Sequence, residues 1–183
     1  MRNVIVPILA FLLCAVGANC QSKENVKTEN SNMEKKILFI NGSPNKDGNT
    51  ANLAKVLLGT RKYETINLTN YKINFYGQTM EGDQLDEIVA KMKSADVVVI
   101  GSPVYWHNIC ASVRAMMERF YGYLSSDDFE GKELYFLYQG EAPTKKMIDD
   151  GEYTMERFAA LYGFDYKGMA TNEQQAKSLS DNL

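Results

Sequence analysis

The chain has 183 residues, a length that suits one domain with short extensions, because domains cluster near roughly 100 to 150 residues. Hydrophobic residues at 45% and charged residues at 23% exclude a wholly disordered chain and a protein with many membrane spans. The net charge of -3 without a long Lys/Arg run argues against nucleic acid as a partner, and three cysteines with a single histidine argue against a zinc site.

Residues 1–19 have the layout of a secretory signal peptide. Arg2 precedes an apolar run from Val4 to Val16, which is shorter than the roughly 20 residues of a membrane-spanning helix, and small residues follow. Cleavage before Cys20 predicts an exported lipoprotein with a lipid anchor at that cysteine, tethered to a membrane and facing the periplasm or the cell exterior. The alternatives are cleavage after Ala18, which would release the protein, and a retained membrane anchor.

The stretch that follows the signal is polar and lacks aromatic residues, so it cannot bury enough apolar surface to fold. We therefore expect residues 20–34 to be a linker, residues 35–171 to be the folded domain and residues 172–183 to be a polar tail. The domain contains no internal repeat, and its composition does not change along its length.

Short apolar runs alternate with stretches of helical periodicity along the domain. Continuous apolar runs that end at glycine are typical of strands covered on both faces, and apolar residues at helical spacing indicate amphipathic helices. In chain order these patterns predict a strand at 37–40, a helix at 52–59, a strand at 63–68, a helix at 83–94, a strand at 97–100, a helix at 111–121, a strand at 133–138, a helix at 153–161 and a weaker strand at 165–170.

Strands that alternate with helices predict an α/β domain with a parallel sheet, right-handed crossovers and helices on both faces. In such sheets, ligands bind outside the carboxyl ends of the strands. The candidate binding loops are therefore those that follow Ile40, Ile100 and Tyr138.

The loop after the first strand, NGSPNKDGNT, has the composition of an anion-binding loop. It opens directly onto a predicted helix, whose N-terminal amides and dipole favour an anion, and Ser43 and Thr50 add hydroxyl donors. The loop is not a Walker loop, because Gly42 and Gly48 are too far apart and Asn49 stands where the lysine would be. It predicts a site for a terminal monophosphate; the alternative is a turn that only ends a strand and caps a helix.

The loop after the third strand, GSPVYWHN, places Tyr105 beside Trp106, the only tryptophan. Ring faces at the mouth of the sheet can clasp a flat aromatic ligand. The alternative is that both rings fold inward as part of the core. His107 follows and could donate a hydrogen bond to an oxygen of such a ligand, or could be a polar residue at a helix entry.

Together, these two segments resemble the flavodoxin-like NADPH-dependent FMN reductase family, whose members carry GSP…GNT after strand one and GSPVY[WF] after strand three. The resemblance implies a flavodoxin-like three-layer sandwich with a five-stranded parallel sheet in the order 2-1-3-4-5. It also implies noncovalent FMN, frequent homodimers, and electron transfer from NAD(P)H to a flavin, quinone or similar small acceptor.

The resemblance also assigns roles to individual positions. It implies that the FMN phosphate is bound by Ser43, Asn45, Asn49 and Thr50. It implies that the isoalloxazine ring is flanked by Pro103, Val104, Tyr105 and Trp106. Gln139 and Gly140, in the loop that follows Tyr138, would lie near the ring edge. His107 is the one candidate catalytic residue.

Other residues of the chain bear on possible metal, thiol and ligand sites. Residues 68–84, where some relatives carry a cysteine cluster, contain no cysteine, which excludes an iron-sulfur cluster there. Cys110 fits a buried helix start better than a redox thiol. Tyr71, Phe75 and Tyr76 fit a ligand mouth, a subunit contact or a cover for the sheet edge. NAD(P)H is scarce outside the inner membrane, so one alternative function is an exported flavodoxin-like electron carrier without pyridine-nucleotide turnover. A second alternative is a binding module whose anion-binding loop holds a nucleotide other than FMN.

Overall fold

The computed structural model describes residues 34–183. The expectations for the signal peptide, for the lipid anchor at Cys20 and for nearly all of the linker fall outside the described residues. Among the described residues, none of the helices is both long enough and apolar enough to span a bilayer.

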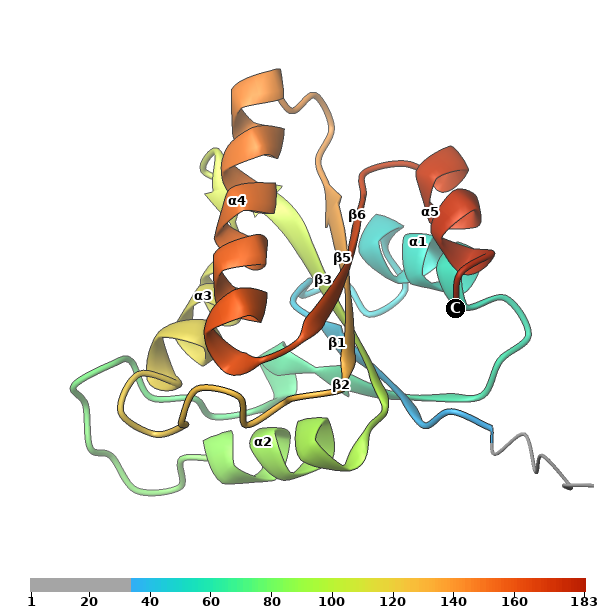
Figure 1. The fold of residues 1–183 in the computed structure, drawn as a ribbon. Coiled ribbons are helices and arrows are strands. Elements are labelled where there is room, and N and C mark those ends of the chain that lie inside the picture. Colours follow the sequence, from blue (N-terminus) through green and yellow to red (C-terminus); the bar gives the residue numbers. More distant parts are fainter. Residues whose placement is uncertain (1–33) are drawn as a thin grey trace, which may run out of the picture. The chain divides into compact units, whose positions relative to one another are not determined.

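The centre of the domain is a sheet of five parallel strands (Figure 1). In spatial order they are β2 (Tyr63–Asn67), β1 (Ile37–Asn41), β3 (Val97–Tyr105), β5 (Glu133–Gln139) and β6 (Asp165–Ala170). Counted among the parallel strands alone, this is the expected order 2-1-3-4-5, so the flavodoxin-like arrangement is confirmed. The sequence did not predict β4 (Asn108–Ile109), a short strand that pairs antiparallel with the end of β3.

Helices cover both faces of the sheet (Figure 1). Helices α1 (Asn49–Leu58) and α5 (Glu173–Ser180) lie on one face, and α2 (Leu85–Ser94), α3 (Ala111–Arg119) and α4 (Lys145–Tyr162) lie on the other. Side chains alternate along each strand, so in β1 Ile37 packs toward α1 while Leu38 packs toward α2. This double coverage is the reason that the central strands are apolar at every position.

One helix begins well before the apolar pattern predicts. Helix α4 begins at Lys145 instead of residue 153, because the Thr144 hydroxyl caps it by accepting a hydrogen bond from the Met147 N–H at 3.3 Å. Its first turns are polar and carry the i,i+4 ion pairs Lys145–Asp149 and Lys146–Asp150. These turns have helical capping and charge patterns but no apolar stripe.

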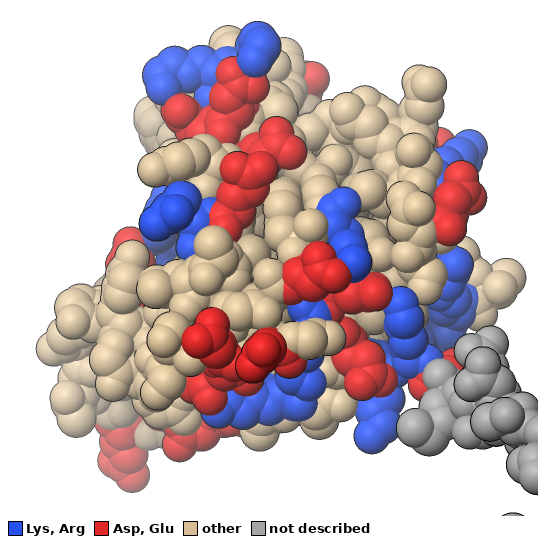
Figure 2. Space-filling model, viewed as in Figure 1, with Lys and Arg blue, Asp and Glu red and all other residues tan. Residues whose placement is uncertain are grey.

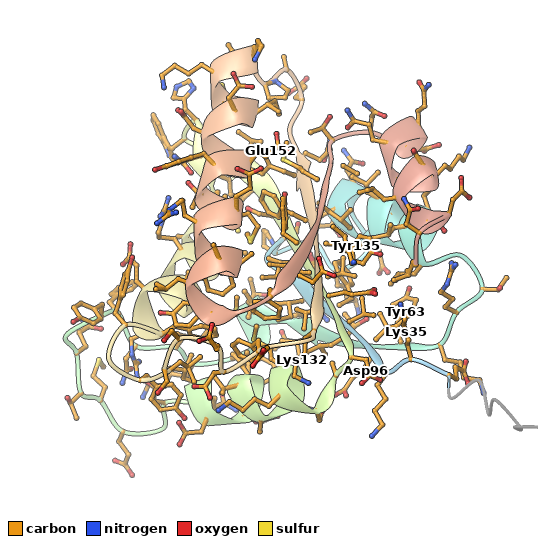
Figure 3. All side chains as sticks on the ribbon, viewed as in Figure 1. Lys35, Tyr63, Asp96, Lys132, Tyr135 and Glu152 are labelled. Atoms are coloured by element: carbon orange, nitrogen blue, oxygen red, sulfur yellow. The ribbon has the colours of Figure 1, made fainter. Side chains whose placement is uncertain are left out.

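The expectation that residues 172–183 form a polar tail outside the domain is wrong. The Asn172 side chain caps α5 by accepting a hydrogen bond from the Gln175 N–H at 3.0 Å, and Ala176 is fully buried. Tyr135 points from β5 toward this face (Figure 3), where its hydroxyl donates to the Asn182 carbonyl at 3.3 Å. Ala176, Leu179 and Leu183 lie at helical spacing and pack against the core, but this apolar stripe is short and the rest of α5 is polar.

The Asp83 carboxylate anchors the long connection between β2 and α2 through several hydrogen bonds. Asp83 accepts hydrogen bonds from the Arg119 guanidinium and from the backbone N–H groups of Leu85 and Asn74. Burial raises the pKa of Asp83, but these bonds outweigh the burial and hold the pKa below its usual range. The connection is therefore held against α3 even though several of its side chains are exposed.

Candidate functional site

A cleft of about 590 Å³ opens at the carboxyl ends of β1, β3 and β5. It is lined by Ser43, Asn45, Gly48, Asn49, Thr50, Pro103, Val104, Tyr105, Gln139, Gly140 and Glu141. Of the residues that the resemblance assigned to a cofactor, all but Trp106 line this cleft. The sequence reasoning missed Glu141, although its place directly after Gly140 in the third candidate loop was a signal for it.

The loop after β1 is organised by its own side chains. Asn41 Oδ1 accepts a hydrogen bond from the Ser43 N–H at 3.1 Å, and Ser43 Oγ accepts one from the Asn45 N–H at 3.2 Å. Asn45 Oδ1 continues the series with the Asp47 N–H at 3.1 Å. These local bonds rigidify the loop. They also occupy backbone amides that sequence reasoning had expected to point toward a ligand.

Helix α1 supplies the donors that remain. Its N-cap is Gly48, which has no side chain to cap the first turn. The N–H groups at the start of α1 are therefore available to an anion, and the helix dipole favours a negative charge there. The hydroxyls of Ser43 and Thr50 and the side-chain amides of Asn45 and Asn49 border the same end of the cleft.

Gly42, at the start of the loop after β1, lies directly against Gly101 of β3. The Gly42 N–H donates to the Gly101 carbonyl at 2.8 Å, and the Gly42 carbonyl accepts a hydrogen bond from Ser112 Oγ at 2.8 Å. A Cβ atom on Gly101 would lie 2.7 Å from Thr50 Cγ2. The two glycine-ended strands found in the sequence therefore allow the two candidate loops to approach each other closely.

The hairpin between β3 and β4 places Trp106 and His107 outside the cleft. Both residues have positive φ, 47° and 66°, in the two-residue turn between Tyr105 and Asn108. The left-handed region costs non-glycine residues roughly 1 to 2 kcal/mol each. The Trp106 side chain is 94% exposed, so it packs neither against the expected cofactor site nor in the core. His107 is exposed in the same turn and does not enter a helix.

A second, smaller chamber of about 310 Å³ adjoins the cleft. Trp106 and His107 line it together with Val104, Gly140, Glu141, Ala142, Pro143 and Met147. Val104, Gly140 and Glu141 belong to both spaces. The candidate site therefore has two neighbouring compartments that share one wall.

Two buried residues adjoin the strand ends that line the cleft, Cys110 and Tyr138. Cys110 is buried, as expected for a helix start, and its N–H donates to Ser102 Oγ at 2.9 Å. Burial raises the pKa of Tyr138 to about 12, with further contributions from Asp150 and Cys110. Tyr138 therefore stays protonated and uncharged at neutral pH.

Residues 35–148 match the sequence model of the family described as NADPH-dependent FMN reductase. The chain belongs to this family. An iron-sulfur flavoprotein of Methanocaldococcus jannaschii is 36% identical over 98 residues, which cover 46% of this chain and 51% of that protein. An FMN-dependent NADH:quinone oxidoreductase of Burkholderia lata is 38% identical over 69 residues, 38% of this chain and 31% of that protein. The chain spans about half the length of the first of these relatives and less of the second.

Solved structures of the same fold cover most of the chain. The Trp repressor binding protein of Bacillus subtilis superposes with a TM-score of 0.66 at 22% identity, covering 81% of this chain and 98% of that one. An FMN-dependent NADH-azoreductase of Bacillus anthracis, solved in complex with FMN, gives a TM-score of 0.57 at 14% identity, covering 81% and 95%. These likenesses establish the flavodoxin-like fold of this family member.

Metal chemistry has no support in the part of the chain that the structure describes. Residues 34–183 contain no group of three or more His, Cys, Asp or Glu side chains placed to hold a metal ion. The iron-sulfur relative is named for a cluster, whereas residues 68–84 of this chain have no cysteine that could ligate one.

Proposed function

We propose that the protein is an FMN-dependent oxidoreductase that passes electrons from NAD(P)H, or another donor, to a small acceptor. One observation carries the proposal. A single cleft joins the uncapped start of α1 at one end to the exposed ring of Tyr105 at the other. This arrangement suits a ligand with a phosphate at one end and a flat ring at the other.

The residues of the cleft fit FMN. A volume of about 590 Å³ lies within the roughly 300 to 1,000 Å³ of small-molecule sites. The phosphate end offers hydroxyls, side-chain amides and helix N–H groups, and it needs no cation. At the other end, Tyr105 offers a ring face, and the Gln139 side-chain amide can hydrogen-bond a ring edge.

FMN, when bound, supplies the electron chemistry, and the protein positions it and controls its surroundings. Ser43 and Thr50 would hold the phosphate, and so fix how far the ring reaches along the cleft. Pro103 and Val104 form a wall that excludes water from one side of the ring. The cleft residues include no acid-base pair, so we expect the protein to contribute orientation rather than proton transfer there.

Anaerobic addition of NADPH to the FMN-loaded protein tests this function. We expect the flavin absorption to bleach and to recover when a small quinone is added, with steady NADPH consumption in air. Bleaching by dithionite but not by NADPH would contradict the pyridine-nucleotide donor and favour the electron carrier. A protein that cannot be loaded with FMN would contradict both functions.

We also propose that a second copy of the chain covers an aromatic face made of Phe75, Tyr76, Tyr121, Tyr153 and Leu161. All five side chains are exposed. The rings of Tyr76 and Tyr121 meet edge to face with centroids 6.2 Å apart. Figure 2 shows a largely uncharged area at the left of the molecule, over α3 and the connection between β2 and α2. Exposed apolar patches of this extent mark interaction sites.

The charges around the aromatic face suit a symmetric partner. Arg114, Arg157 and Glu118 line the groove between α3 and α4, and none of them belongs to an ion pair of the described chain. A two-fold interface places the same patch on both subunits, so an arginine of one copy can face the glutamate of the other.

Light scattering after size exclusion tests this interface. We expect the unmodified protein to be a dimer and Leu161→Lys, which puts a charge into the groove, to be a monomer. Ala160→Lys is the matched control, because Ala160 is exposed on the same helix but does not line the groove. A dimer that survives Leu161→Lys would contradict the assigned face.

A further inference from the structure

A basic groove lies at the edge of the sheet opposite the cleft. It has a volume of about 560 Å³ and runs between the amino ends of β1 and β2 and the C-terminal end of α2. Its charged lining residues are four lysines and two glutamates: Lys35, Lys36, Lys62, Lys91, Glu34 and Glu64. Figure 2 shows Lys and Arg side chains at the lower right, where Figure 3 labels Lys35 and Tyr63. Among the described residues that line the cleft, by contrast, only Glu141 is charged.

Two lysines of this groove lie side by side without an acidic partner. In the parallel register Ile37 lies opposite Tyr63, so Lys36 and Lys62, one residue earlier in each segment, are neighbours on the same face. Both are exposed, and neither belongs to an ion pair among residues 34–183. Like charges on neighbouring strands destabilise a sheet. An anion outside the described chain would offset this repulsion.

The acidic groups beside the lysine pair are engaged elsewhere. Glu64 pairs with Lys91, and Asp96 accepts a hydrogen bond from the Lys36 backbone N–H at 2.8 Å. Glu34 is the one acidic lining residue outside an ion pair of the described chain. The groove therefore keeps an excess of positive charge.

The position of the groove relates it to the N-terminal segment. Cys20, the predicted lipid anchor, lies fourteen residues before Glu34, a separation of at most roughly 50 Å even in a fully extended chain. The nine residues of β3 run from the groove edge at Val97 to the cleft at Tyr105, roughly 25 Å away at about 3.3 Å per residue. A lipid anchor would therefore keep the domain near the bilayer, with the chain entering at the groove and not at the cleft.

We propose that the basic groove contacts the anionic phospholipid headgroups of the membrane that holds the chain. Lys36 and Lys62 lie against lipid phosphates, and each lysine near an anionic surface strengthens the contact about fivefold. The anchor makes this contact intramolecular, so a weak attraction is enough to orient the domain. The cleft, at the opposite edge, then opens to the aqueous phase. The inference goes beyond the proposed function and holds with or without FMN.

Energy transfer from a single tryptophan to dansyl-labelled lipid headgroups tests this orientation. The full chain is incorporated into phosphatidylcholine vesicles with or without phosphatidylglycerol. Trp106, the only tryptophan, reports on the cleft side, and Ser94→Trp with Trp106→Phe moves the reporter to the groove, which Ser94 lines. On the anionic vesicles we expect several-fold more efficient transfer from the groove position. On phosphatidylcholine alone the two positions should give equal transfer.

Two pairs of lysine substitutions show whether the groove is the contact. Lys36→Gln with Lys62→Gln should weaken the contact about 25-fold and remove the difference between the two reporter positions. Lys145→Gln with Lys146→Gln is the matched control, because it changes the net charge equally at the start of α4, after the cleft end of β5, and it should keep the orientation. The groove variant should have an unchanged or higher melting temperature, since it relieves repulsion.

Several results would overturn the proposal. These are a full chain that does not associate with the vesicles, equal transfer from the two positions on anionic vesicles, and an orientation that survives the loss of Lys36 and Lys62. A lower melting temperature of the groove variant would show that the two lysines serve the fold. Loss of the orientation in inorganic phosphate at constant ionic strength would identify a soluble anion as the ligand and would contradict the membrane contact.

Discussion

Replacing Gly42 with alanine should destabilise the domain by about 3 kcal/mol, the upper end of the usual cost of overpacking a core. The new Cβ atom would lie 2.5 Å from Val113 Cγ2, 2.7 Å from Cys110 Sγ and 3.0 Å from the Gly101 carbonyl oxygen. Val113 is fully buried, and one of the three neighbours is backbone, so the clash cannot be relieved by moving one flexible side chain. Urea denaturation measures the effect as a loss of unfolding free energy.

Two further variants show whether the clash is the cause. Gly77 is the control glycine, because a Cβ there meets nothing within 4 Å and an alanine pays only for its φ of 83°, about 1 kcal/mol. Adding Val113→Ala to Gly42→Ala removes the closest contact, so the double variant should be more stable than the sum of the single effects predicts. A Gly42→Ala protein within about 0.5 kcal/mol of the unmodified one would contradict the close packing of the two loops.

Replacing Thr50 with valine should weaken FMN binding about ten- to a hundredfold. A hydrogen bond to a charged phosphate contributes about 1.5 to 3 kcal/mol, and each 1.4 kcal/mol is a factor of about ten in affinity. Thr50 is 2% exposed, and its methyl group packs over Gly101. Valine keeps that methyl group and replaces the hydroxyl with a second methyl group of similar size, so the fold should be preserved.

Fluorescence titration of FMN measures this loss of affinity. Thr60→Val is the matched control, because Thr60 is exposed beyond the end of α1 and does not line the cleft. We expect the control to bind FMN as the unmodified protein does. Equal affinities in the two variants would remove Thr50 from the phosphate site.

The strands of the sheet could be predicted from the sequence, because a strand that is buried on both faces is apolar at every position. Val97 to Ile100 are all apolar and end at a glycine, as in β1, so both strand positions and their common edge could be predicted. The start of α4 and all of α5 could not. These segments begin at the caps Thr144 and Asn172 and are mostly polar, and the apolar stripe of α5 and the residues after it is limited to Ala176, Leu179 and Leu183.

The loops of the candidate site could be predicted, because they lie where the strands end. The loops that converge on the cleft could be named from the glycines that close the strands. The position of Trp106 could not be predicted, because neither Trp nor His favours positive φ and no local pattern signals that turn. The use of the Ser43 and Asn45 amides within their own loop was equally hidden, since it depends on side-chain rotamers.

A crystal structure of the protein soaked with FMN tests the central claim most directly. We expect the phosphate to lie within hydrogen-bonding distance of Ser43 Oγ, Thr50 Oγ1 and the first N–H groups of α1. The ring should lie along Pro103 to Tyr105, with Trp106 still free at the rim. A phosphate bound elsewhere, or a ring that leaves the cleft between the loop after β1 and the end of β3 empty, would contradict the account.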